Sequence, residues 1–118
     1  MTKTAAAPQS APLWIGGRKE KARSGKTFPV VNPADGETIA LVSEGGADDL
    51  DAAVDAAEAA LSGPWGKLSP RERARLMFKA AARVREAQEE LALLETRNTG
   101  KPMADSRDEA AGVADTLE

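Results

Sequence analysis

Cysteine and histidine are both missing from the 118 residues of this sequence. Without a thiol, the chain can form no disulfide and offers no cysteine nucleophile. Without an imidazole, it lacks the side chain that most often serves as a general base or metal ligand. These two absences exclude the commonest forms of covalent and acid–base catalysis by this chain alone.

Bulky apolar side chains are scarce as well. Leu, Ile, Val and Phe account for 20 residues, whereas alanine alone accounts for 24. Such a low bulky content is compatible with disorder in highly charged chains, but the net charge here is only −3 and the apolar residues are periodic. We therefore expect a folded segment with an under-filled core that is marginally stable and depends on another domain or chain.

Several classes of protein are disfavoured by what the chain lacks. Residues 1–12 do not resemble a secretory signal, and no apolar run approaches the roughly 18 residues that span a bilayer. The chain is acidic, and its aromatic residues are too dispersed to stack on bases; packing roles are expected for Trp14, Phe28, Trp65 and Phe78. We expect a soluble cytoplasmic protein that binds neither nucleic acid nor membrane.

The first third of the chain predicts a tail and two β-hairpins. Residues 1–12 have the composition of a disordered tail. A strand at 13–15 and a charged return strand at 18–23 are joined by Gly16-Gly17, a suitable two-residue turn. Two further strands are predicted at 27–31 and 37–42, and the sequence N-P-A-D-G at 32–36 between them is a strong turn signal. Pro29 places the first of these strands at a sheet edge.

Helical patterns fill the rest. One helix is expected over about 47–61, with Leu50, Val54, Ala57 and Leu61 buried and Trp65 plugging the following loop. The pattern over 69–102 begins with a capping signal at Ser69 and Glu72 and ends at Gly100. Its apolar stripe comprises Met77, Ala80, Val84, Ala87, Leu91 and Leu94.

The charges within 69–102 predict two helices instead of one. Cations crowd its first half and carboxylates its second, which opposes the macrodipole of a single helix. A break near residues 85–88 removes the conflict, although no good N-cap residue marks the second start. A last helical pattern, 103–118, has no stop signal, which predicts a truncated chain.

Candidate binding groups all have structural alternatives. The basic cluster from Arg71 to Arg85 could bind phosphate, but a solvated or ion-paired face is favoured, with the acidic helix before it as a natural partner. Lys101 could contact phosphate or substrate; covering the last helical carbonyls is favoured. The pairs Gly16-Gly17 and Gly45-Gly46 fit turns and match no phosphate-loop pattern.

Several motifs in fixed order carry a family resemblance. They are L-W-I-G-G at 13–17, S-G-K-T-F-P-V-V-N-P-A-D-G-E at 24–37, G-P-W at 63–65, S-P-R-E-R at 69–73, L-E-T at 94–96 and G-K-P at 100–102. Together they resemble the N-terminal segment of the NAD(P)-dependent aldehyde dehydrogenase superfamily. The resemblance implies an α/β fold, in which residues 13–118 form the truncated N-terminal part of a coenzyme-binding domain: two short hairpins, then three or four helices.

In complete members, the resemblance implies a thiolate that attacks an aldehyde, hydride transfer to NAD or NADP, and release of a carboxylic acid by an oligomeric enzyme. The catalytic and coenzyme residues of the family would lie beyond this segment, so none is assigned here and no coenzyme is expected for the chain alone. The resemblance also implies one possible site in this segment, a monovalent cation held by Val30, Val31 and Asn98. The favoured alternative is that Asn98 only caps the helix.

Two hypotheses follow. The first is an N-terminal fragment of such an oxidoreductase, inactive alone, whose partners are the remainder of the enzyme or further copies. The second is a non-catalytic helical interaction module derived from one. A last helix that ends in a stop signal would favour the module, and the helical pattern at 103–118 contains no such signal.

Overall fold

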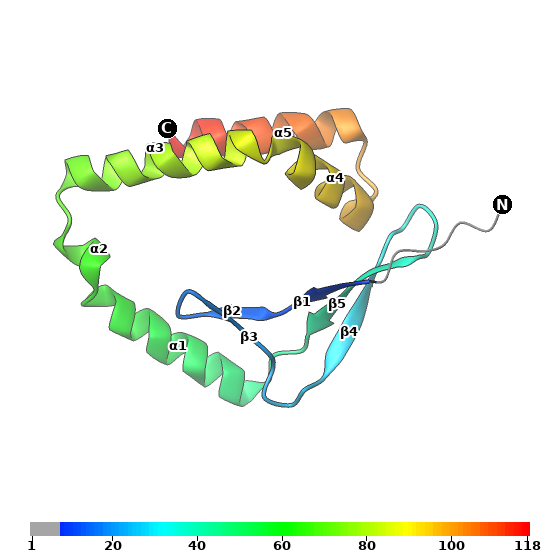
Figure 1. The fold of residues 1–118 in the computed structure, drawn as a ribbon, viewed down its shortest axis with the longest axis horizontal. Helices are drawn as coiled ribbons and strands as arrows, with labels where there is room; N and C mark the ends of the chain where they lie inside the picture. Colours follow the sequence, from blue (N-terminus) through cyan, green and yellow to red (C-terminus); the bar gives the residue numbers. More distant parts are fainter. Residues whose placement is uncertain (1–7) are drawn as a thin grey trace. The chain divides into compact units, whose positions relative to one another are not determined.

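The computed structural model describes residues 8–118, which form two compact units. The sheet unit ends at Ala60, and the helical unit comprises Leu61–Glu118. Figure 1 shows the strands and the first long helix in blue to green, followed by the remaining helices in green to red. Among the described residues, no helix is both long and apolar enough to cross a bilayer.

Both predicted hairpins are present in the sheet unit. Strands β2 (Leu13–Ile15) and β3 (Arg18–Glu20) pair antiparallel, and both intervening glycines have positive φ, 58° at Gly16 and 76° at Gly17. Such a turn penalises any residue with a Cβ. The return strand is shorter than predicted, because a turn in which the Gly25 amide donates to the Ala22 carbonyl (2.8 Å) follows it.

The second hairpin joins β4 (Thr27–Val31) to β5 (Thr38–Ser43). Its turn forms as predicted: the Gly36 amide donates to the Asn32 carbonyl at 2.8 Å, and the Asn32 side chain accepts from the Ala34 amide at 3.0 Å. The sheet order β1-β5-β4 leaves β4 at an edge, which confirms the position inferred from Pro29.

The predicted disordered tail is wrong at its C-terminal end. Gln9–Ala11 form strand β1, which pairs in parallel with β5 in the register Ser10 to Leu41. A ladder is made by backbone groups, so a segment without bulky side chains can still pair with a free strand edge. The remainder of that prediction, residues 1–7, lies outside the described part of the chain.

Helix α1 (Ala47–Leu61) is anchored by Asp49, which is only 6% exposed. Its carboxylate accepts hydrogen bonds from the Gly46 amide at 2.9 Å and from the Arg23 amide at 3.1 Å. The bond from Gly46 and then that from Arg23 lower the pKa of Asp49 below its usual value. One side chain therefore caps the helix and ties it to the turn after β3.

Substitution of Asp49 by asparagine is expected to destabilise the sheet unit at neutral pH, with a penalty that vanishes in acid. A carboxylate whose pKa is depressed by folding adds stability above its unfolded pKa, near 3.8, and loses that stability as the pH falls through the folded value. Urea denaturation of both proteins between pH 7 and pH 2 should therefore show two stability curves that converge below about pH 4. A constant gap would contradict this role.

The helical unit opens with a short helix that the sequence analysis missed. Trp65 was predicted to plug a loop, but it lies in α2 (Pro64–Lys67), is 48% exposed and has the Arg73 guanidinium over its ring at 5.7 Å. A Cβ on Gly66 would lie 2.9 Å from the Leu61 carbonyl oxygen, so this turn requires glycine. A single turn has too little periodicity to be detected from sequence.

Two consecutive helices follow, as predicted. Helix α3 (Pro70–Glu86) begins with a capping box in which Ser69 and Glu72 bond each other's backbone amides. Helix α4 (Gln88–Thr99) begins after Ala87, whose φ of −95° and ψ of 7° break the helical run, and it has no side-chain cap. The conflict of charges with the macrodipole thus located the break correctly.

Small residues form the core of the helical unit. Helix α5 (Met103–Leu117) packs against both α3 and α4, and Figure 1 shows it running alongside α3. The buried residues of these helices are Ala81, Ala92, Ser106, Ala110 and Ala114. Residues without bulk let helix backbones approach closely.

The predicted burial of the larger apolar stripes is wrong for this chain. In the 69–102 pattern, Met77, Leu91 and Leu94 remain exposed, and in α1 Leu50, Val54 and Leu61 do so too. These helices have the predicted periodicity, but within the described residues of each unit no element fully buries these larger side chains. The under-filled core expected from composition is what the structure shows.

Candidate functional site

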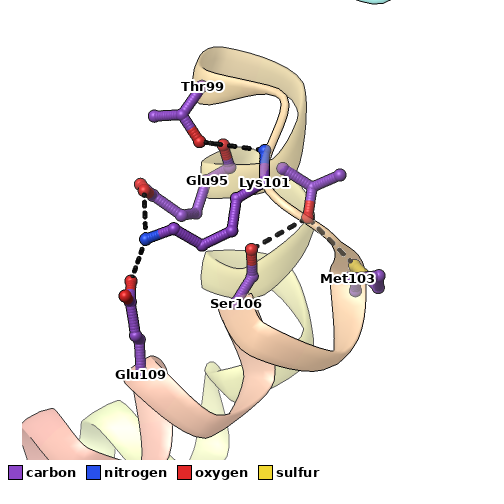
Figure 2. A network of polar contacts seen from close by, with 7 residues as sticks. Glu95, Thr99, Lys101, Met103, Ser106 and Glu109 are labelled. Atoms are coloured by element: carbon purple, nitrogen blue, oxygen red, sulfur yellow. Dashed lines mark hydrogen bonds and ion pairs between the residues drawn. The ribbon is translucent and has the colours of Figure 1, made fainter.

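Side chains around the α4–α5 turn of the helical unit form a connected polar cluster (Figure 2). The turn is set by Gly100, whose φ of 79° is left-handed and whose amide donates to the Thr96 carbonyl at 2.9 Å. The Thr99 hydroxyl donates to the Glu95 carbonyl at 2.9 Å and accepts from the Lys101 amide at 3.3 Å. Polar groups at the end of α4 therefore find hydrogen-bond partners within the turn itself.

Lys101 links the two helices that flank this turn. Its ammonium pairs with Glu95 of α4 at 3.4 Å and with Glu109 of α5, and Figure 2 shows it between the two carboxylates. The bond to Glu109 raises the pKa of Lys101 above its usual value. Neither role considered from the sequence, a phosphate contact or a cover for helical carbonyls, describes this side chain, because its partner Glu109 lies on the next helix.

A second link lies beside it, between Thr96 and Ser106. Their hydroxyl oxygens are 3.0 Å apart, and the Thr96 hydroxyl also lies 3.5 Å from the Met103 sulfur. Ser106 is 1% exposed. This buried hydroxyl therefore joins α5 to Thr96 of α4.

An open apolar groove adjoins the cluster. Its volume is about 490 Å³, and it is lined by Val84, Leu91, Leu94, Glu95, Asn98, Ser106, Glu109, Ala110 and Val113. Its two carboxylates are the ones that Lys101 holds. Such a lining can receive apolar groups of a partner or ligand.

The basic cluster predicted between Arg71 and Arg85 is in part an ion-paired face. Arg83 pairs with Glu86 at 2.7 Å, and Arg85 contacts Asp115 at 2.8 Å and Glu118 at 2.9 Å. The hydrogen bond to Asp115, followed by that to Glu118, raises the pKa of Arg85 above its usual value. The contacts of Arg85 hold the end of α3 against the end of α5, and Arg83 pairs within α3; neither indicates a phosphate site.

The predicted cation site is distributed over both units. Val30 and Val31 lie in β4, where the ladder has an irregularity between them, and Asn98 lies in α4. The alternative that Asn98 caps the helix is wrong, because Gly100 is the C-cap and Asn98 lines the groove. Because the residues belong to separate units, the site stays a prediction. Within residues 8–118, no group of three acidic side chains is placed to hold a metal ion.

Two structural roles were not predicted from the sequence. Asp49 follows Gly46 by three residues, the spacing of a capping box, which was a usable signal for its helix-capping bond. Its bond to the distant Arg23 amide had no signal. The row Ser106, Ala110 and Ala114 repeats every four residues, which could have marked the packed side of α5 had small residues been weighed as core.

Comparison with known proteins assigns the segment to a family. The model of the aldehyde dehydrogenase family matches residues 20–118. The chain belongs to this family.

Individual relatives agree with that assignment. The chain is 47% identical over 95 residues to aldehyde dehydrogenase family 2 member B4, mitochondrial, of Arabidopsis thaliana, covering 80% of this chain. It is 46% identical over 89 residues, 75% of this chain, to 2-hydroxymuconic semialdehyde dehydrogenase of a Pseudomonas species. In both cases it spans only 18% of the relative's length.

A solved structure confirms the fold as the N-terminal part of this family. The NAD-dependent aldehyde dehydrogenase of Sinorhizobium meliloti superposes with a TM-score of 0.90 at 40% identity. The match covers 94% of this chain and 22% of that one. The short strands followed by helices are thus the arrangement found in the corresponding part of a complete enzyme.

Proposed function

We propose that this chain is the leading segment of the coenzyme-binding domain of an NAD(P)-dependent aldehyde dehydrogenase, which oxidises an aldehyde to a carboxylic acid. The observation that carries the proposal is the family match over residues 20–118, at a coverage of only 18% of the curated relatives. The segment's contribution is architectural, because its described polar groups cap and join helices.

Two features of the chain support a role within a larger enzyme. The sequence contains no cysteine, so it cannot itself supply the thiolate that this chemistry requires. Large apolar residues on three helices are exposed, among them Leu61, Phe78 and Leu94, and apolar surface of this kind is stabilised by burial against further protein. The remainder of the enzyme is the partner that we propose for these faces.

A chimera tests this proposal. Residues 8–118 would replace the corresponding segment of the Pseudomonas 2-hydroxymuconic semialdehyde dehydrogenase, and NADH formation from its substrate would be measured. Because similar cores tolerate substitutions that conserve volume and pattern, we expect activity within about tenfold of the parent. Deletion of the segment should abolish activity, and the isolated chain should form no NADH. An inactive but folded chimera, or turnover by the isolated chain, would refute the proposal.

The same proposal includes the coenzyme, the further partners and the location of the complete protein. Its coenzyme would be NAD or NADP, bound by residues outside the present chain, and its further partners would be copies of the same enzyme. Several solved neighbours support the coenzyme class, one of them described as NAD-dependent and another in complex with nicotinamide adenine dinucleotide. A cytoplasmic location remains a prediction from the sequence.

The monovalent cation site at Val30, Val31 and Asn98 is part of the proposal. Backbone carbonyls and an amide oxygen are hard ligands that suit such an ion, and the ladder is irregular between the two valines, where Ile39 of β5 falls outside the register. Soaking a crystal of the complete protein with thallium is expected to give anomalous signal at these residues. Signal elsewhere, with none here, would eliminate the site.

A further inference from the structure

The turn between β4 and β5 contains the one aspartate of the sequence that is directly followed by glycine, Asp35, and no asparagine precedes a glycine. Glycine has no Cβ, so little hinders its amide nitrogen from approaching the side-chain carboxyl carbon of the residue before it. The pair Asp35-Gly36 is therefore the place where this chain is chemically most prone to close an aspartyl ring on its own backbone.

This ring closure is a condensation that needs no other reactant. The Gly36 nitrogen forms a bond to Cγ of Asp35, the nitrogen loses its proton, and one carboxyl oxygen leaves as water, which gives a succinimide. Water then returns at one of the two ring carbonyls. Attack at the side-chain carbonyl restores aspartate, whereas attack at the main-chain carbonyl breaks the original peptide bond and leaves isoaspartate, with the chain running through Cγ.

In the folded turn, both reacting groups are held by other partners. The Gly36 amide donates to the Asn32 carbonyl at 2.8 Å, and the Asp35 carboxylate accepts from the Glu37 amide at 3.0 Å. Asn32, which is 9% exposed, stabilises the turn further: its side chain accepts from the Ala34 amide at 3.0 Å, and its own amide donates to the Glu37 carbonyl at 2.9 Å. The Gly36 nitrogen therefore cannot reach Cγ of Asp35 until these bonds open.

We propose that Asp35 is the isomerisation site of this segment and that the hydrogen bonds of the closed turn suppress the reaction. The reaction then proceeds only from open turns, and its rate follows the fraction of molecules in which the turn is open. Isoaspartate adds one carbon to the main chain, so the backbone groups of Asn32 and Glu37 can no longer pair as they do in the intact turn. The adjoining pair, Val31 and Thr38, would lose its register as a result.

The first test compares the complete protein that carries this segment with a synthetic peptide of residues 30–41, because an isolated hairpin is marginally stable at best. Both are incubated near physiological temperature and pH, and isoaspartate is measured by mass spectrometry of the digested chain. The folded protein is expected to isomerise at least about tenfold more slowly than the peptide. Equal or faster isomerisation in the folded protein, or none at Asp35 in the peptide, overturns the proposal.

Substitutions at Asn32 make the test specific. Asn32→Ala removes the acceptor for the Ala34 amide, and loss of one such bond should speed isomerisation in the folded protein about fivefold. Asn32→Asp retains an acceptor oxygen at that position and should isomerise at nearly the wild-type rate. Asp35→Glu is the blank, because its longer side chain would have to close a larger ring, which forms far more slowly.

Asp105 gives an internal comparison in the same protein. It precedes Ser106, whose Cβ hinders ring closure and whose amide donates to the Pro102 carbonyl at 3.1 Å. Isomerisation at Asp105 should stay at background in every variant. An Asn32→Ala protein that is folded by circular dichroism and isomerises at the wild-type rate would refute protection by the turn, and equal isomerisation at Asp105 and Asp35 would refute the site. The peptide comparison does not depend on the folding of any variant.

Discussion

Leucine in place of Ala114 is expected to lower the free energy of unfolding of the helical unit by about 3 kcal/mol, the upper end for overpacking a core. Ala114 has no exposed surface and belongs to the side of α5 that packs against α3 and α4. Three additional carbon atoms cannot enter this contact unless the helices separate. In a unit whose core consists of small residues, such a loss would approach the whole of its stability.

The measurement is urea denaturation followed by far-UV circular dichroism. Gly112 provides the control on the same helix, because a Cβ at that position meets nothing within 4 Å. Gly112→Ala is expected to raise the free energy of unfolding by about 0.5–1 kcal/mol, since alanine has the higher helix propensity. Equal effects of the two substitutions would show that the row Ser106, Ala110 and Ala114 does not set the helix spacing.

Valine in place of Gly100 is expected to cost about 2 kcal/mol. The backbone there has a φ of 79°, a left-handed conformation that penalises residues with a Cβ and β-branched residues most of all. A backbone that moves to relieve the strain would also shift Lys101, the next residue, away from Glu95 and Glu109. The loss should therefore include the contact between α4 and α5.

Urea denaturation of Gly100→Val and Gly100→Asn separates these effects. Asparagine tolerates the left-handed region better than other residues with a Cβ, so its penalty should be clearly smaller. Hydrogen exchange should show faster opening of the amides at the end of α4 in the valine variant. Equal stability of the two variants would mean that the turn does not depend on left-handed backbone.

Much of the helical unit was predictable because its signals act over a few residues. Ser69 and Glu72 form their capping box, Gly100 ends α4, and the break at Ala87 lies where the charges change sign. Both hairpins form at their glycine-rich or N-P-A-D-G turns for the same reason. Each of these features depends on backbone conformation and hydrogen bonds within one turn of the chain.

The candidate site was predicted less well, since its contacts join separate elements. Lys101 could be assigned to a helix-connecting turn, but its partner Glu109 depends on how α5 folds back on α4. The pairing of β1 with β5 also joins segments far apart in sequence. Neither contact leaves a pattern in a single sequence that distinguishes it from other pairings.

The amino-acid order alone established the positions of the hairpins and long helices, the family, and the inability of this chain to supply a thiolate. Periodicity, turn residues and composition are properties of neighbouring residues, so no tertiary contact was needed. Folding in three dimensions decided which side of each helix is covered: Ala81, Ala92, Ser106, Ala110 and Ala114 are buried, whereas larger residues such as Leu50, Phe78 and Leu94 are exposed. Burial depends on which surfaces meet, and in this segment the close approach of small residues determines it.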